Sequence, residues 1–144
     1  MLIKATLPEA KDAAFLASLL WPGQSLEEFV QEMKDFIENA DSAIFLVYSE
    51  REAIGFAHCE LRNDYVEGTN SSPVGYLEGI YVKENYRQQG IARRLVQACE
   101  NWAKGKGCQE FASDCELNNK DSLGMHLKLG FEEANRIICF KKKI

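Results

Sequence analysis

One segment of the chain combines glycine, arginine and a helix start in a way that suits phosphate binding. Residues 87–94 read RQQGIARR and lie between a predicted strand and a predicted helix. Glycine lets the backbone approach a ligand closely, and the free N–H groups at a helix N-terminus attract phosphate oxygens. The segment therefore indicates a pyrophosphate site. The same residues also fit an ordinary polar turn that leads into a solvent-facing basic helix.

Several other catalytic motifs are absent from the sequence. There is no G-x-x-x-x-G-K-S/T loop, and Gly105 and Gly107 are followed by Glu110 where a dinucleotide-binding fingerprint needs glycine. With only His58 and His126, the chain has no H-E-x-x-H pair, and it has no G-x-S-x-G elbow. These absences exclude the familiar nucleotide-binding loops and disfavour metalloprotease and serine-hydrolase chemistry, and we expect no bound metal.

The cysteines are scattered along the chain, which argues against a disulfide framework or a zinc knuckle. Their number, five, is odd, and no two of them form a C-x-x-C pair. We interpret them as small buried apolar residues of an unexported protein. They are Cys59, Cys99, Cys108, Cys115 and Cys139.

Length and composition indicate a single globular domain over residues 1–144. The chain has 144 residues, of which 46% are hydrophobic and 27% charged. Its 17 basic and 22 acidic residues give a net charge of −5, which disfavours a nucleic acid or an anionic membrane as partner and favours a cationic one. No apolar run is long enough to span a bilayer and no signal peptide is evident, so we expect a cytoplasmic protein.

Hydrophobic periodicity predicts a mixed α/β chain. A hairpin near the middle requires antiparallel strands, whereas the strand-helix-strand passages of the C-terminal half favour parallel neighbours. The expected elements, in chain order, are a strand at 3–6, a helix that ends at 21–23, a helix over 26–37, strands at 43–48 and 53–62, a loop at 63–73, a strand at 74–82, a helix from 91 that Gly105 and Gly107 end, a strand at 110–115, a helix at 121–129 and a strand at 132–141.

The strand at 74–82 has the residues of greatest chemical interest. Simple alternation predicts Glu78 and Ile80 on one face, and Leu77 and Tyr81 on the other. Gly79 lies between them and is typical of a bulge that redirects the backbone.

These segments resemble one enzyme family. The strand GYLEGIYV, followed by RQQGIA and an amphipathic helix, resembles the acetyl-CoA signature of the GNAT superfamily of N-acetyltransferases. The segments LLWPG, RNDYVEG, SSPVGYLEGIYV, FASD and HLKLGFEE together resemble the short, single-domain aminoglycoside 6′-N-acetyltransferases. The resemblance covers nearly the whole chain. It implies the GNAT acetyltransferase fold, an α/β (α+β) architecture with a central mixed β-sheet flanked by helices.

The resemblance also implies a site for acetyl-CoA. The backbone of the strand would bind the pantetheine arm through Ile80, Tyr81 and Val82, and Asn119 would face the cofactor. The turn that follows would bind the pyrophosphate. Its residues are Arg87, Gln88, Gln89, Gly90, Ile91, Ala92 and Arg93.

An acceptor site is implied in the same way. Trp21, Tyr65, Glu78 and Asp114 match positions that line the aminoglycoside site in such enzymes, with the two aromatic rings as walls against the sugar rings. Asn135 stands where relatives commonly have an acidic residue, which alters part of the acidic lining and hence the drug preference. From the sequence alone, core or loop packing is the favoured interpretation of Trp21 and Tyr65, and only the resemblance reverses that order.

The chemistry needs a proton acceptor and a cation site, because an amine attacks a thioester only when it is neutral. We expect Glu78 to take up the proton of the amine, directly or through water, and Asp114 to hold neighbouring ammonium groups. A backbone N–H freed near Ile80 would polarise the thioester carbonyl. His126 occupies the place where many GNAT enzymes have a tyrosine that protonates the leaving thiolate. A solvated Glu78, a strand-end Asp114 and a packed His126 are the alternative interpretations.

These inferences predict an aminoglycoside 6′-N-acetyltransferase that transfers acetyl from acetyl-CoA by direct attack and so confers resistance. Relatives are commonly dimeric, so the resemblance implies a homodimer. Two alternatives remain: a GNAT enzyme for polyamines or other small amines, and a non-catalytic module that binds acyl-CoA or aminoglycoside.

Overall fold

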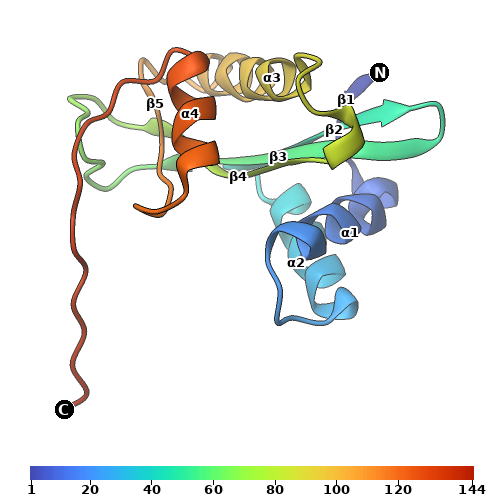
Figure 1. Cartoon of the computed structure of the whole chain (residues 1–144), viewed down its shortest axis with the longest axis horizontal. Coiled ribbons are helices and arrows are strands. Elements are labelled where there is room, and N and C mark those ends of the chain that lie inside the picture. Colours follow the sequence, from blue (N-terminus) through green and yellow to red (C-terminus); the bar gives the residue numbers. More distant parts are fainter.

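A single sheet with helices on both faces forms the body of the molecule (Figure 1). The computed structural model describes all residues, 1–144. Its elements are β1 (Leu2–Lys4), a 3-10 turn (Leu7–Glu9), α1 (Ala10–Leu20), α2 (Leu26–Glu38), β2 (Ser42–Ser49), β3 (Glu52–Arg62), β4 (Val74–Val82), a second 3-10 turn (Glu84–Tyr86), α3 (Ile91–Gly105), β5 (Phe111–Ser113) and α4 (Lys120–Lys128).

The five strands lie in the order of the sequence, β1-β2-β3-β4-β5. All neighbours are antiparallel except β4 and β5, which are parallel because α3 carries the chain back between them. The mixed sheet expected from the sequence is therefore confirmed, including the hairpin of β2 and β3.

Alternation along β2 divides its apolar residues between two cores. Phe45 and Val47 join Leu95 of α3 in one cluster, whereas Ile44 and Leu46 join α1 and α2 in the other. Helices α3 and α4 lie on one side of the sheet in Figure 1, and α1 and α2 lie on the opposite side. Helix α2 begins where the sequence predicts, with the Ser25 hydroxyl accepting the N–H of Glu28 at 3.1 Å.

A bulge in β4 corrects the faces expected for this strand. The register between β3 and β4 shifts by one residue, so that His58 lies opposite Gly79 and Cys59 opposite Leu77. Because the extra residue reverses the alternation, Leu77 and Ile80 both pack toward α3. Glu78 therefore does not share a face with Ile80, and Leu77 does not share one with Tyr81. The sequence pattern predicted the bulge but not which side chains it would separate.

The strand expected at 132–141 does not form. Residues 131–144 have no helix or strand, and the segment runs away from the body in Figure 1. The side chains of Ile137, Ile138 and Phe140 are 70%, 78% and 89% exposed. The apolar run that predicted a strand is present, but a strand needs a hydrogen-bonding neighbour and this segment has none within the chain.

The expectation of five buried cysteines is correct for three of them. Cys59, Cys99 and Cys108 are buried, whereas Cys115 and Cys139 are exposed. The two exposed residues follow the end of β5 and lie in the extended C-terminal segment, where no layer covers them.

Leu95 is central to the cluster between α3 and the sheet and is fully buried. Leu95→Ala should lower the free energy of unfolding by about 2–5 kcal/mol, since it removes buried carbons and leaves a cavity. Urea denaturation measures this. Leu26→Ala, the same deletion at a half-exposed position of α2, is the control and should cost about 1 kcal/mol or less. Equal losses in the two variants would contradict this account of the core.

Candidate acetyltransfer site

The turn that leads into α3 presents unpaired backbone N–H groups to open space. Gln88 and Gly90 both have a left-handed backbone, with φ of 62° and 78°. Gly90 is the N-cap of α3 and has no side-chain cap, so the first N–H groups of the helix remain available to a ligand. A Cβ at Gly90 would meet no atom within 4 Å. This geometry suits an anion, as the sequence motif suggested.

The arginines of the turn are partly occupied within the protein. The Nε of Arg87 donates to the carbonyl oxygen of Val82 at 2.8 Å, which ties the turn to the end of β4. The Nη2 of Arg93 donates to the carbonyl oxygen of Lys128 at 2.9 Å and so caps the C-terminus of α4. Both side chains therefore fix the shape of the turn, and the backbone N–H groups remain as its main anion donors.

One edge of β4 is open next to this turn. Pairing with β5 covers only Gly75 to Leu77, whereas pairing with β3 continues to Val82. From Glu78 onward, the backbone groups on the β5 side of β4 therefore have no strand partner. An extended polar chain such as pantetheine can add to this edge, which includes Ile80, Tyr81 and Val82. Asn119 lies beyond β5 as the N-cap of α4, where its side chain accepts the N–H of Ser122 at 3.0 Å.

Glu78 lies on the sheet face that α1 and α2 cover, and the bulge that follows keeps Ile80 off this face. There the Nη2 of Arg62 donates to both carboxylate oxygens of Glu78, at 2.5 and 2.8 Å. The guanidinium of Arg62 lies 3.4 Å from the centre of the Tyr76 ring, and the Tyr76 hydroxyl donates to Asp114. Burial and then the hydrogen bond to Asp114 raise the pKa of Tyr76, so it stays a donor at neutral pH. The predicted carboxylates Glu78 and Asp114 are thus joined through two residues that the sequence analysis did not identify.

Trp21 lies directly against the bulge. A side chain at Gly79 would collide with the indole ring, so the glycine is required for this contact. The ring also packs edge-on against Phe56, with centroids 6.3 Å apart. Trp21 is partly exposed and so forms one wall beside Glu78.

Tyr65 and Asn135 both donate hydrogen bonds to Glu67. Tyr65 is largely exposed and its hydroxyl donates to Glu67 at 3.2 Å, while Asn135 donates to the other oxygen of Glu67 at 3.1 Å. The structure therefore places the predicted loop residue beside the start of the extended C-terminal segment. Glu67 supplies a carboxylate at this place, next to the position where relatives commonly have one.

Hydrogen bonds fix the tautomer of His126. Its Nδ1 lies 2.7 Å from the carbonyl oxygen of Ser122, which only accepts, so Nδ1 has the proton. In the neutral ring Nε2 is then an acceptor, and the Ser113 hydroxyl donates to it at 2.7 Å. Neutral His126 therefore has no proton to give directly to a thiolate, and Ser113 lies between it and the open edge of β4.

His58 and Glu60 complete the face that holds Glu78. His58 is 4% exposed, stacks on Phe36 and lies 2.9 Å from the Ser42 hydroxyl and 3.3 Å from Glu60. Burial lowers the pKa of His58 to about 4, so the ring is neutral at pH 7. Burial, and next the charge of Glu78, raise the pKa of Glu60. The signal for this face was present in the sequence as polar residues at every second position of β3.

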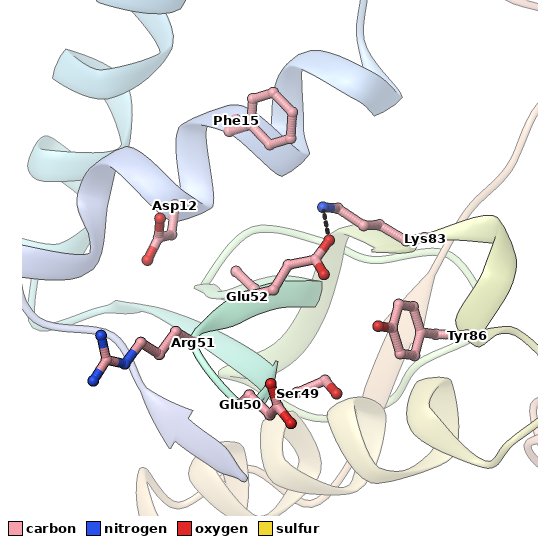
Figure 2. Close-up of a pocket in the computed structure, with 9 residues that line it drawn as sticks. Asp12, Phe15, Ser49, Glu50, Arg51, Glu52, Lys83 and Tyr86 are labelled. Atoms are coloured by element: carbon pink, nitrogen blue, oxygen red, sulfur yellow. Dashed lines mark hydrogen bonds and ion pairs between the residues drawn. The ribbon is translucent and has the colours of Figure 1, made fainter.

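A hollow of about 720 Å³ lies elsewhere, at the β2–β3 turn (Figure 2). It is lined by charged and polar side chains from α1, the turn and the end of β4, and the ion pair of Lys83 with Glu52, at 2.6 Å, crosses it. None of the predicted site residues lines this hollow. The predicted residues of β4 and of the turn that follows it therefore lie outside this hollow.

Comparison with known proteins shows the family of the chain. The profile of the Acetyltransferase (GNAT) family matches residues 11–131. An aminoglycoside N(6′)-acetyltransferase type 1 from Acinetobacter genomosp. 13 is 48% identical over 90% of this chain and 88% of that protein. No helix of the chain has the length and apolar character needed to cross a membrane.

Solved structures of aminoglycoside 6′-N-acetyltransferases are also similar to this chain. The aminoglycoside 6′-N-acetyltransferase AAC(6′)-Ih from Acinetobacter baumannii superposes with a TM-score of 0.94 at 41% identity, covering 100% of this chain and 98% of that one. AAC(6′)-Iy, in complex with the bisubstrate analogue CoA-S-monomethyl-acetylneamine, superposes with a TM-score of 0.95 at 35% identity and the same coverage. The chain is therefore a member of the GNAT family of acetyltransferases, an acetyl-CoA-dependent enzyme similar to aminoglycoside N(6′)-acetyltransferases along almost its whole length.

Proposed function

We propose that this protein acetylates the 6′-amino group of aminoglycosides by direct attack of the amine on acetyl-CoA. The observation that supports this most strongly is the bulge at Glu78, because it places a carboxylate where the open edge of β4 meets an acidic face. A thioester laid along that edge would lie beside the carboxylate. A polycationic acceptor suits a face that has Glu60, Glu78 and Asp114.

Each residue then has a distinct task. The backbone of Ile80 to Val82 holds the pantetheine arm, and an N–H near Ile80 polarises the thioester carbonyl. Glu78 takes the proton of the attacking amine, directly or through water. Asp114, oriented by the Tyr76 hydroxyl, holds a neighbouring ammonium group. Direct transfer needs no acyl-enzyme, and no cysteine is required as a nucleophile.

The acetylated drug would lose one positive charge and one hydrogen-bond donor. Such a change weakens binding to an anionic RNA target, which is how the reaction would confer resistance. A cytoplasmic location fits this proposal, since acetyl-CoA is made inside cells and all five cysteines are free thiols.

The extended C-terminal segment supports a homodimer. Residues 137–140 read IICF, an uninterrupted apolar run typical of a strand that is buried on both faces. In a single chain this run is exposed, and β5 forms the edge of the sheet. A second copy would let the segment pair and bury its side chains.

The acceptor site is tested by replacing its two carboxylates with neutral isosteres. With a 6′-amino aminoglycoside and acetyl-CoA, Glu78→Gln should lower kcat by about 10²–10⁴-fold, because it removes the proton acceptor. Asp114→Asn should mainly raise KM, because it removes a charge used for binding. Release of the CoA thiol measures both, and mass spectrometry with NMR assigns the acetylated nitrogen.

Glu32→Gln, at an exposed position on α2, is the control and should leave both constants unchanged. Wild-type constants in both site variants would refute the assigned roles. Acetylation of polyamines in preference to every 6′-amino aminoglycoside would refute the proposed substrate. If no CoA thiol is released with either kind of acceptor, the protein is a binding module.

We propose that protonated His126 assists departure of the CoA thiolate through the Ser113 hydroxyl. As the C–S bond breaks, the Ser113 hydroxyl gives its proton to the sulfur and the Nε2–H of the imidazolium replaces that proton on Ser113 Oγ, which leaves the neutral ring with its proton on Nδ1. His126→Ala and Ser113→Ala should each lower kcat by about ten-fold, a modest effect because a thiolate is a tolerable leaving group. The double variant should be no slower than either single variant, since the two groups act as a unit. Single-turnover kinetics measure this. A wild-type kcat and pH profile in His126→Ala would leave the histidine a packing role.

Dimer formation is tested in the C-terminal segment. Ile138→Asp should convert the dimer to monomer in light scattering at micromolar concentration, because it puts a charge into the proposed buried strand. Ile144→Asp makes the same change outside the apolar run and should leave the dimer intact. A monomeric wild-type protein would rule the homodimer out.

A further inference from the structure

The carboxylate of Glu78 is already engaged by a cation that belongs to the protein. Arg62 bonds both of its oxygens, and the other ion pairs of the molecule do not involve Asp114 or Glu78. The side chain of Arg62 is 44% exposed, whereas that of Glu78 is 17% exposed. Arg62 is therefore the more solvent-accessible partner, and its hydrogen bonds occupy both carboxylate oxygens that an arriving ammonium group would use.

Arg62 provides the positive charge of an otherwise acidic face. Its neighbours are the carboxylates Glu60, Glu78 and Asp114. The other basic side chain on this face, His58, is buried and neutral. Without Arg62, Glu78 would lie beside the like charge of Glu60 with no cation to offset it. A substrate ammonium that reaches Glu78 takes over this same function.

The guanidinium of Arg62 also contacts an aromatic ring. It stacks at 3.4 Å on the ring of Tyr76, whose hydroxyl leads to Asp114. Stacking does not require Glu78, so Arg62 can lose its ion pair and keep contact with the aromatic face. A partly exposed ion pair is weakly held, which makes the exchange feasible.

We propose that Arg62 is a resident counter-ion of the amine site and a specificity-determining residue, which a substrate ammonium must replace on Glu78. This inference rests on the proposed role of Glu78 in binding the acceptor amine. An acceptor with several ammonium groups offsets the lost ion pair by engaging Asp114 and Glu60 as well as Glu78. An acceptor with a single ammonium group reaches Glu78 only. Arg62 thereby selects for polycations, and each oxygen that it releases becomes an acceptor for the N–H of the amine.

The test compares two acceptors on matched arginine variants. Neamine has several ammonium groups, and 6-amino-6-deoxyglucose has one; calorimetry without acetyl-CoA gives their Kd values, and thiol release gives kcat and KM. In Arg62→Met the Kd of 6-amino-6-deoxyglucose divided by the Kd of neamine should fall about five-fold, mainly because the monoamine binds more tightly. Arg62→Lys keeps the charge but not the planar guanidinium that stacks on Tyr76, and it should narrow the ratio less. Arg51→Met, at the opposite end of β3 and outside any ion pair, should leave the ratio unchanged.

The outcomes separate this inference from the proposed function. The inference is overturned if the Kd ratio is unchanged in Arg62→Met, or if both ligands lose affinity equally and the Tm falls. Arg62 then has only a structural role, and the proposed function stands as long as neamine is still acetylated. If Arg62→Met does not fold, Arg62→Lys decides, and a ratio equal to wild type there overturns the inference. Failure of the wild-type enzyme to bind or acetylate neamine refutes the proposed function itself.

Discussion

The structure depends on one extra residue in β4 relative to β3. Glu78 lies on the same face as Tyr76 and Arg62, and uninterrupted alternation would direct Ile80 to that face as well. The bulge reverses the alternation after Glu78, so that Ile80 packs in the apolar layer under α3, and it is possible only because Gly79 leaves room for the indole of Trp21. A single backbone irregularity thus separates the carboxylate from the apolar residues that follow it and brings the proposed acceptor and cofactor sides together.

The two sides of the proposed site differ in whether backbone or side-chain groups form them. The proposed cofactor side consists of backbone groups, namely the open edge of β4 and the uncapped start of α3. The proposed acceptor side consists of side chains from β3, β4 and the residues after β5. Because the backbone geometry depends on Gly90 and on the strand pairing, substitutions on the acceptor face can alter substrate preference without disturbing the cofactor.

Local patterns predicted the elements well because they depend on periodicity and caps that a sequence displays. The hairpin, α2 with its Ser25 cap and the parallel placement of β5 followed from such signals. The pairing of Arg62 with Glu78 did not, since it depends on a register shift between strands that no local pattern specifies. The Nε2 partner of His126 was missed for the same reason, because Ser113 is thirteen residues away on another element. The strand at 132–141 was wrong because an apolar run shows what can pair but not with what.

The exposed run IICF also bears on aggregation. A short exposed apolar segment with high β-propensity, in a chain that also has an unprotected sheet edge, is a feature from which chains build aggregates. Three lysines follow it directly, at 141–143, and their charge opposes the stacking of one such segment on another. While the segment is exposed, these charges therefore give a protection against aggregation that the stability of the folded domain does not supply.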